Sequence, residues 1–171
     1  DDNEDYGNIA AGATSAMPDG FAWEVANNIP DMHDVTFGIE TTDGSDIWTS
    51  SMTITGHAPK LSIGQVIIDD GGQGNGNGNL DPGETVDLII NTHNDGSYVA
   101  LNTLGSLLTT SAFVTINNVE FNVGDIDSSS IATATFNITI AEETPIGSQI
   151  EFIYKAVSGE YEADGTFTLT A

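Results

Sequence analysis

The sequence predicts an all-β sandwich, and three observations support that fold class. Short runs of alternating apolar and polar residues recur about every ten residues, bounded by Gly, Asn, Asp and Pro. No segment has helical periodicity. Residues 21–55 also match residues 136–170 without a gap, 115 positions further on (136 − 21). A match that keeps apolar type at alternating positions indicates two copies of one β-rich domain.

The two copies are unequal in length. A further match relates residues 6–9 to residues 123–126, at an offset of 117. About sixty residues precede the matching blocks in the second copy, whereas almost none precede them in the first. We therefore expect the C-terminal half of one immunoglobulin-like domain at 1–57 and a complete domain at 58–171. The apolar matches are Phe21 with Phe136, Pro30 with Pro145, Val35 with Ile150, Phe37 with Phe152, Met52 with Phe167, and Ile54 with Leu169.

The alternation places seven strands in the complete domain, the number found in a simple immunoglobulin-like sandwich. The same pattern predicts three strands in the half domain, with Asp43 and Gly44 in the turn of the last hairpin. Pro59 lacks an amide donor, so the linker around it is expected to be short and stiff. The expected strands are 61–68, 85–91, 101–109, 113–116, 131–140, 149–157 and 165–170, preceded by 21–25, 35–39 and 48–55.

The charge is strongly acidic, with 26 Asp and Glu against Lys60 and Lys155 and a formal net charge of −24. Nucleic acid and anionic membrane surfaces are excluded as partners, because both require clusters of Lys or Arg. No run approaches the ~20 apolar residues of a membrane span. The balance favours divalent cations and high solubility, and it also fits a halophilic source or a generic acidic surface.

A Gly- and Asn-rich loop between the first two strands of the complete domain predicts a calcium site. Calcium takes six to eight oxygen ligands from carboxylates, amides and backbone carbonyls, and glycines let a short segment curl around the ion. The spacing departs from an EF-hand, since the last acid comes too early and no helix flanks the loop. A flexible hairpin that binds nothing is the alternative. The candidate ligands are Asp69, Asp70, Asn75, Asn77, Asp81 and Glu84.

These elements resemble a known family of repeats. Ala58-Pro59 ahead of a strand, the acidic Gly-Asn loop, the run Leu80 to Thr85 and the turn Asn94-x-Gly96 are similar to immunoglobulin-like repeats of secreted and cell-surface proteins of Bacteroidetes and related bacteria. These include the sandwich domains of gingipain-like cysteine peptidases and the CARDB-like repeats. The resemblance covers residues 58–171 as a whole domain and 6–56 as a half. It implies a non-catalytic spacer, adhesin or fibre unit.

Enzymatic activity is not expected. The chain contains no cysteine, so gingipain-like chemistry cannot reside in it. His33, His57 and His93 lack the spacing of a zinc site, and no Gly-x-Ser-x-Gly elbow is present. Trp23 and Trp48 fit a carbohydrate-stacking pair, although core packing is favoured for Trp23. Asn137 heads a formal glycosylation sequon.

The sequence therefore predicts an extracellular or cell-surface structural or adhesive module with a calcium-stabilised loop. The alternative is the accessory substrate- or glycan-binding region of a secreted peptidase or glycosidase. Half a sandwich exposes its inner face and its sheet edges to water. We expect the missing half to come from upstream sequence or from a neighbouring copy, and the second case gives a homopolymer assembled head-to-tail by strand complementation.

Overall fold

Ten strands and no helix form the regular structure of this computed structural model, which describes residues 3–171. Residues 1 and 2 of the predicted half domain lie outside the described part. The chain is all-β, as predicted. The strands are β1 Asp34–Thr42, β2 Ile47–Thr55, β3 Leu61–Asp69, β4 Thr85–Asn94, β5 Ala100–Thr109, β6 Val114–Ile116, β7 Glu120–Ile126, β8 Ser130–Ile140, β9 Gln149–Ser158 and β10 Tyr161–Thr170.

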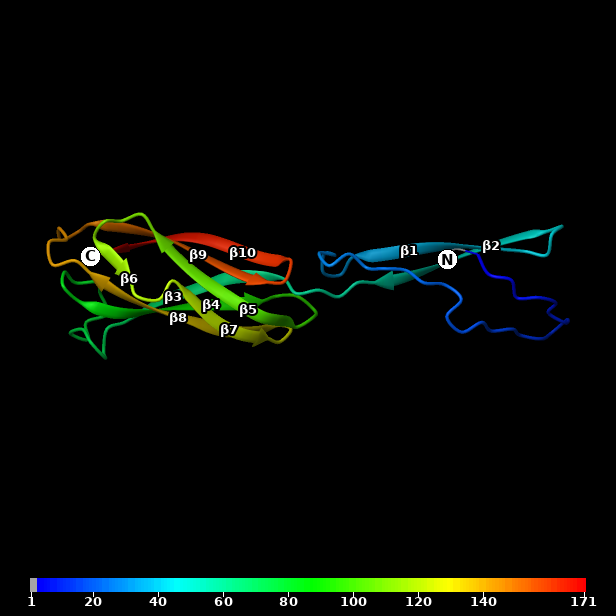
Figure 1. Cartoon of the computed structure of the whole chain (residues 1–171), viewed down its shortest axis with the longest axis horizontal. Coiled ribbons are helices and arrows are strands. Elements are labelled where there is room, and N and C mark those ends of the chain that lie inside the picture. Colours follow the sequence, from blue (N-terminus) through cyan, green and yellow to red (C-terminus); the bar gives the residue numbers. More distant parts are fainter. Residues whose placement is uncertain (1–2) are drawn as a thin grey trace.

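Residues 58–171 form two antiparallel four-stranded sheets that face each other, with strand orders β3-β4-β8-β6 and β10-β9-β5-β7. We call this part the sandwich. Alternate residues point inward, as the burial of every second residue along β4, β8 and β9 shows. Phe136, Phe152 and Tyr154 are the largest side chains of the closed core, and all three are fully buried. β3 begins beside the hairpin β1–β2, and β10 ends at the opposite end of the sandwich (Figure 1).

All seven strands predicted for this part are present, with ends that differ by a few residues. The prediction missed one strand, β7, which pairs with β5. Phe121 and Val123 alternate as in any strand, but Gly124 has a positive φ of 83° and the pairing with β5 shifts register beside it. This irregularity breaks the period of two on which the prediction relied.

The hairpin β1–β2 is the only regular structure found in residues 3–57, which we call the hairpin unit. Its predicted strands and its turn at Asp43 and Gly44 are confirmed. Its register is that of the hairpin β9–β10: Asp34 pairs with Thr55, and the residues 115 positions later, Gln149 and Thr170, also pair. The repeat seen in the sequence is therefore repeated in the backbone pairing.

Turns outside the strands repeat as well. A hydrogen bond from His33 N to Pro30 O corresponds to one from Ser148 N to Pro145 O. At the offset of 117, the carboxylate of Asp5 accepts the amide of Gly7, as the side chain of Asn122 accepts the amide of Gly124. Both glycines have positive φ. The hairpin unit thus folds locally as the corresponding part of the sandwich does.

The predicted strand at 21–25 is wrong, because these residues have no regular structure. They correspond to part of β8, which hydrogen-bonds to β4 on one side and to β6 on the other. The hairpin unit has no strand equivalent to β4 or β6, so the backbone groups of this segment lack a ladder. Phe21 is 54% exposed as a result, whereas its counterpart Phe136 is fully buried.

This contrast gives a matched test. We expect Phe136→Ala to lower the free energy of unfolding of the sandwich by about 3–5 kcal/mol, because it empties a closed core. Phe21→Ala should change it by less than about 0.5 kcal/mol, as for a surface site. Urea unfolding followed by far-ultraviolet circular dichroism measures both. Equal losses for the two variants would contradict the assignment of Phe21 to an open face.

Candidate functional site

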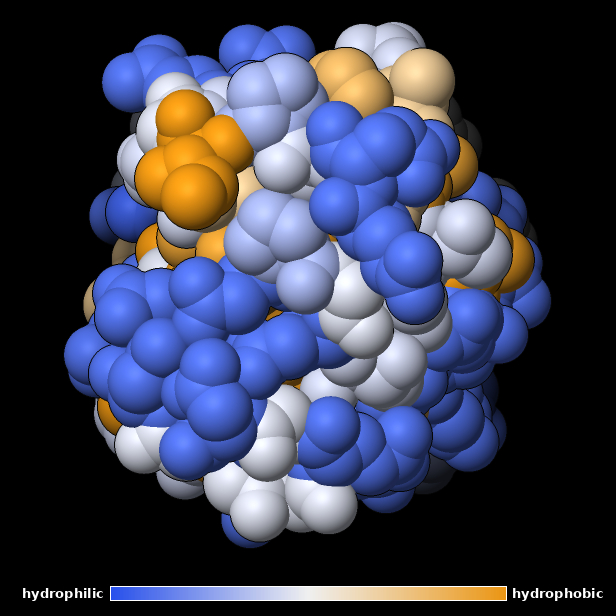
Figure 2. Space-filling model, turned by 90° about the vertical axis from the view of Figure 1, so that its left-hand side faces the viewer, coloured by the Kyte–Doolittle hydropathy of each residue, from blue (hydrophilic) through white to orange (hydrophobic). Residues whose placement is uncertain are grey.

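The acidic loop lies at the end of the sandwich remote from the hairpin unit, where it connects β3 to β4 (Figure 1). Figure 2 views this end, which presents mainly hydrophilic residues with a few separate apolar patches. Leu80 anchors the loop, because its side chain is fully buried in the core. Asp70 is also buried, with only 4% of its surface exposed.

Three carboxylates organise the loop through hydrogen bonds. Asp70 Oδ2 accepts the backbone amides of Asn77, at 2.9 Å, and Gly78, at 3.0 Å. Glu84 Oε1 accepts the amide of Asn75 at 2.9 Å. Asp81 Oδ2 accepts the side-chain amides of Asn75 and Asn77, at 2.8 and 2.7 Å. Five of the six predicted ligands therefore belong to one hydrogen-bonded network.

Asp69 stands outside this network. It is the last residue of β3, and its Oδ1 accepts the amide of Gly71 at 3.2 Å. The glycines have steric roles in the loop: Gly76 and Gly78 adopt φ near 78° and 77°, a region that side chains disfavour. A Cβ on Gly74 would lie 2.8 Å from the backbone of Asp70 and 3.3 Å from Cδ of Glu84. Only glycine lets the chain pass between these two acids.

Glu84 carries the one buried side-chain oxygen without a hydrogen-bond partner found in residues 3–171, its Oε2. A buried carboxylate oxygen without a partner is costly. A cation beside Glu84 would satisfy this oxygen. No three His, Asp or Glu residues of the described range form a group that could hold a metal by themselves. Calcium would therefore need amide and backbone oxygens as ligands, with Asn75 and Asn77 turning their oxygens toward it.

Asn137 lies in the middle of β8 and its side chain is engaged on both sides. Its Nδ2 donates to Asp87 Oδ1 at 2.7 Å, and its Oδ1 accepts Asn117 Nδ2 at 2.7 Å. Glycosylation would use the same Nδ2 atom. A glycan at Asn137 would therefore break the hydrogen bond to Asp87.

Asp31 joins the hairpin unit to the sandwich. Its Oδ1 accepts the amide of Ala58 at 3.0 Å and the hydroxyl of Ser97, while its Oδ2 accepts the amide of Ser97 at 3.2 Å. These hydrogen bonds, chiefly the one from the Ser97 hydroxyl, lower the pKa of Asp31 below its ordinary value of 3.8. His57 also contacts Ser97, at 2.6 Å, and the Tyr161 hydroxyl donates to the carbonyl of Ile29.

The hairpin β1–β2 carries an apolar face. One side of the hairpin carries threonines, such as Thr36 and Thr53, whose hydroxyls hydrogen-bond to each other. The other side carries the apolar residues Val35, Phe37, Ile39, Trp48, Met52 and Ile54. Trp48 is 54% exposed and Met52 45% exposed. Trp23 packs against Phe37 from the irregular segment, with ring centroids 5.4 Å apart.

The sequence prediction missed the role of Asp31. The sequence shows only that an acid directly follows Pro30, and the partner Ser97 lies 66 positions away. Comparison with models of known protein families and with curated proteins finds no match. In the described part of the chain, no helix is long and apolar enough to cross a membrane.

The junction at Asp31 is expected to depend on pH. A carboxylate whose pKa is lowered by folding stabilises the folded contact above its unfolded pKa, and this contribution is lost as the pH falls through the folded value. The backbone amide signals of Ala58 and Ser97 in NMR spectra should therefore titrate together, with a midpoint below 3.8. Asp31→Ala should abolish this titration, whereas Asp127→Ala, at an exposed turn, should preserve it. Titration that persists in Asp31→Ala would contradict the assignment.

Proposed function

We propose that the chain is a non-catalytic, extracellular part of a tandem array of immunoglobulin-like domains, with a structural or adhesive role. The observation that carries this proposal is the repeat itself: one hairpin register and one set of turns occur in both units. The resemblance of residues 58–171 to immunoglobulin-like repeats of secreted and cell-surface proteins supports the extracellular setting. The fixed contacts of Asp31 across the linker favour a stiff rod over a flexible tether.

The strand orders support an immunoglobulin-like topology for residues 58–171. β3-β4-β8-β6 matches the order A-B-E-D of constant-type immunoglobulin domains, and β10-β9-β5 matches G-F-C. β7 is an additional strand beside the C equivalent, and it follows the D equivalent along the chain. Residues 3–57 then correspond to the C-terminal half of such a domain, including the F–G hairpin.

We propose that the missing half of this first domain is supplied from outside residues 3–171. The apolar face of the hairpin and the unpaired segment 21–25 support this, because both would be covered in a complete domain. The homopolymer in which a neighbouring copy supplies the strands is less favoured. Every strand of the sandwich is already paired within it, so a donating copy would have to open its own core.

We also propose that calcium binds the acidic loop, through Asp70, Asn75, Asn77, Asp81 and Glu84, with Asp69 at its border. The unpartnered Oε2 of Glu84 supports this choice. In Figure 1 the C-terminus lies at the same end of the sandwich as this loop, so in the proposed array calcium would bind near a junction between domains. A site of the affinity of extracellular calcium modules fits this role.

Surface display is tested on the cells that produce the protein. Antibodies against residues 58–171 should label intact cells, and electron microscopy should show the label on rods or fibres outside the cell envelope. Label seen only after permeabilisation would contradict an extracellular role. Sedimentation of the purified chain across a concentration range tests the homopolymer, which requires growth into large species.

Calcium binding is tested by thermal unfolding. With the affinity of extracellular calcium modules, 10 mM calcium should stabilise the folded chain by about 1.4–2.7 kcal/mol. For a domain of this size the rise in Tm is about 5–15 °C. Glu84→Gln should remove most of the calcium-dependent rise, whereas Glu160→Gln, at the turn between β9 and β10, should retain it. No rise in the unmodified chain at 10 mM would reject the site.

A further inference from the structure

The hairpin unit lacks neighbours on two sides, and the sandwich shows which strands would fill them. In the sandwich, β9 pairs with β10 on one edge and with β5 on the other. Within residues 3–171, β1, the counterpart of β9, pairs only with β2. Its second edge is therefore free at the place where β5 lies in the sandwich.

The facing layer is missing in the same way. Counterparts of Phe21 and Trp23 are Phe136 and Ile138 in β8, which pair with Leu88 and Val86 of β4. The segment already lies near its place in a sandwich, since Trp23 packs against Phe37 as a residue of the opposite layer would. What it lacks is a strand to hydrogen-bond with.

Resting on the proposed tandem array, we propose that the hairpin unit is a receptor for a donor segment equivalent to residues 58–121, whose strands take the places of β3, β4, β5 and β6. The offset of 115 fixes the register. The donor residue equivalent to Thr109 lies opposite Phe37, and the residue equivalent to Leu104 lies opposite Thr42. The donor residue equivalent to Leu88 lies opposite Phe21.

A donor whose sequence differs from residues 58–121 at defined positions would fit the hairpin unit better. In the sandwich, Gly165 lies against Ile63, and a Cβ on Gly165 would be 3.0 Å from Ile63 Cδ1. The hairpin unit has Ser50 at the position of Gly165, so an isoleucine at the position of Ile63 would have to shift its Cδ1. A smaller residue at the position of Ile63 removes this contact. Conversely, Gly105 in the sandwich leaves room for the ring of Tyr154. The hairpin unit has Ile39 at the position of Tyr154. The donor therefore does not require this glycine.

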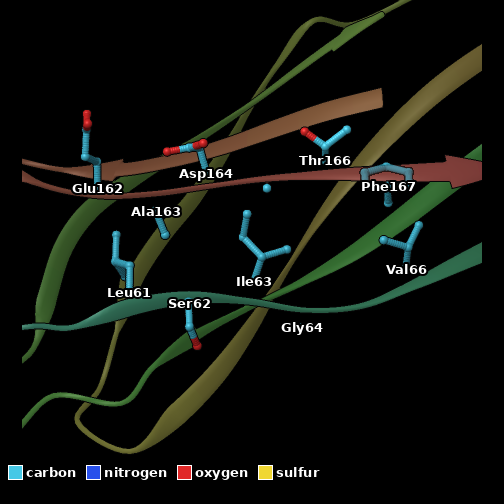
Figure 3. Close-up of a pocket in the computed structure, with 11 residues that line it drawn as sticks. Leu61, Ser62, Ile63, Gly64, Val66, Glu162, Ala163, Asp164, Thr166 and Phe167 are labelled. Carbon is cyan, nitrogen blue, oxygen red and sulfur yellow. The ribbon is translucent and has the colours of Figure 1, made fainter. Parts of the chain in front are cut away.

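Trp48 fits a groove that the sandwich leaves open. Between β3 and β10 lies a groove of about 550 Å³, where Ala163 faces Leu61 and Ile63 (Figure 3). Trp48 occupies the position of Ala163 in the hairpin unit. With a smaller residue in place of Ile63, the indole ring would lie in this groove and cover part of the seam between donor and hairpin. The donor is accordingly a related repeat of distinct sequence, rather than a second copy of residues 58–121.

Tryptophan fluorescence can report whether the apolar face of the hairpin unit is covered. Its two tryptophans, Trp23 and Trp48, both lie in the hairpin unit, and both are about half exposed. Burial by a donor moves their fluorescence emission to shorter wavelength. The sandwich contains no tryptophan and contributes nothing to this signal.

The experiment fuses a donor segment to the N-terminal side of the hairpin unit. Because Phe121 corresponds to residue 4 at the offset of 117, a copy of residues 58–121 is fused directly ahead of Asp5. One fusion carries the native donor, a second carries Ile63→Ala in the donor only, and a third carries Leu88→Asn and Leu107→Asn in the donor as the control. The unfused chain is the reference. Urea unfolding of the sandwich verifies that each fusion is folded.

We expect the Ile63→Ala donor to shift the tryptophan emission to shorter wavelength and to protect amides of residues 15–25 and 37–42 from hydrogen exchange. The native donor should do so less, and the control donor should match the unfused chain. Unshifted emission with both the native and the Ile63→Ala donors, in fusions whose sandwich is folded, would overturn the inference. So would a concentration-dependent shift in the unfused chain, since a second copy would then cover the face. Neither result bears on display outside the cell, which the antibody labelling tests separately.

Discussion

The structure depends on one constraint: a sheet with one apolar face is stable in water only when a second layer covers that face. In residues 58–171 the constraint is met, and Phe136, Phe152 and Tyr154 are fully buried between the sheets. The buried hydroxyl of Tyr154 is satisfied by Thr92 at 2.7 Å, so the polar atom in the core has a partner. In the hairpin unit the same pattern of residues leaves an open face. The difference between the two units is therefore one of missing neighbours, since their local sequences match.

The two units also show which structure is local and which depends on partners. Hairpin register and turns survive in the hairpin unit because adjacent residues make them. The segment equivalent to β8 does not form a strand, although Phe21, Trp23 and Val25 alternate as well as their counterparts do. A central strand needs hydrogen bonds on both edges, which no sequence of its own can supply. The period of two is thus a necessary signal of a strand, and it is insufficient without a neighbour.

Much of the fold could be predicted from the sequence, because β strands of this chain alternate cleanly and their turns carry Gly, Asn, Asp or Pro. β7 was missed because Gly124 interrupts its alternation. For the loop, the sequence predicted that carboxylates and amides come together because glycines let the chain curl. Asp70, Asp81 and Glu84 do lie in one hydrogen-bonded network. The sequence could not reveal that the Asp69 carboxylate accepts the amide of Gly71 outside the network, nor that Asp31 hydrogen-bonds to Ser97. Such contacts depend on how distant loops are placed by the sandwich.

The direction of the first and last strands of the sandwich has a mechanical consequence. β3 begins beside the hairpin unit and β10 ends at the far end of the sandwich. In the array that we propose, tension along its length would pull these two strands in opposite directions. The hydrogen bonds from β3 to β4 and from β10 to β9 lie across that direction, and they are loaded together rather than one after another. A module built in this way resists stretching by shear, and its lifetime under load is set by the rate of its unfolding rather than by its equilibrium stability.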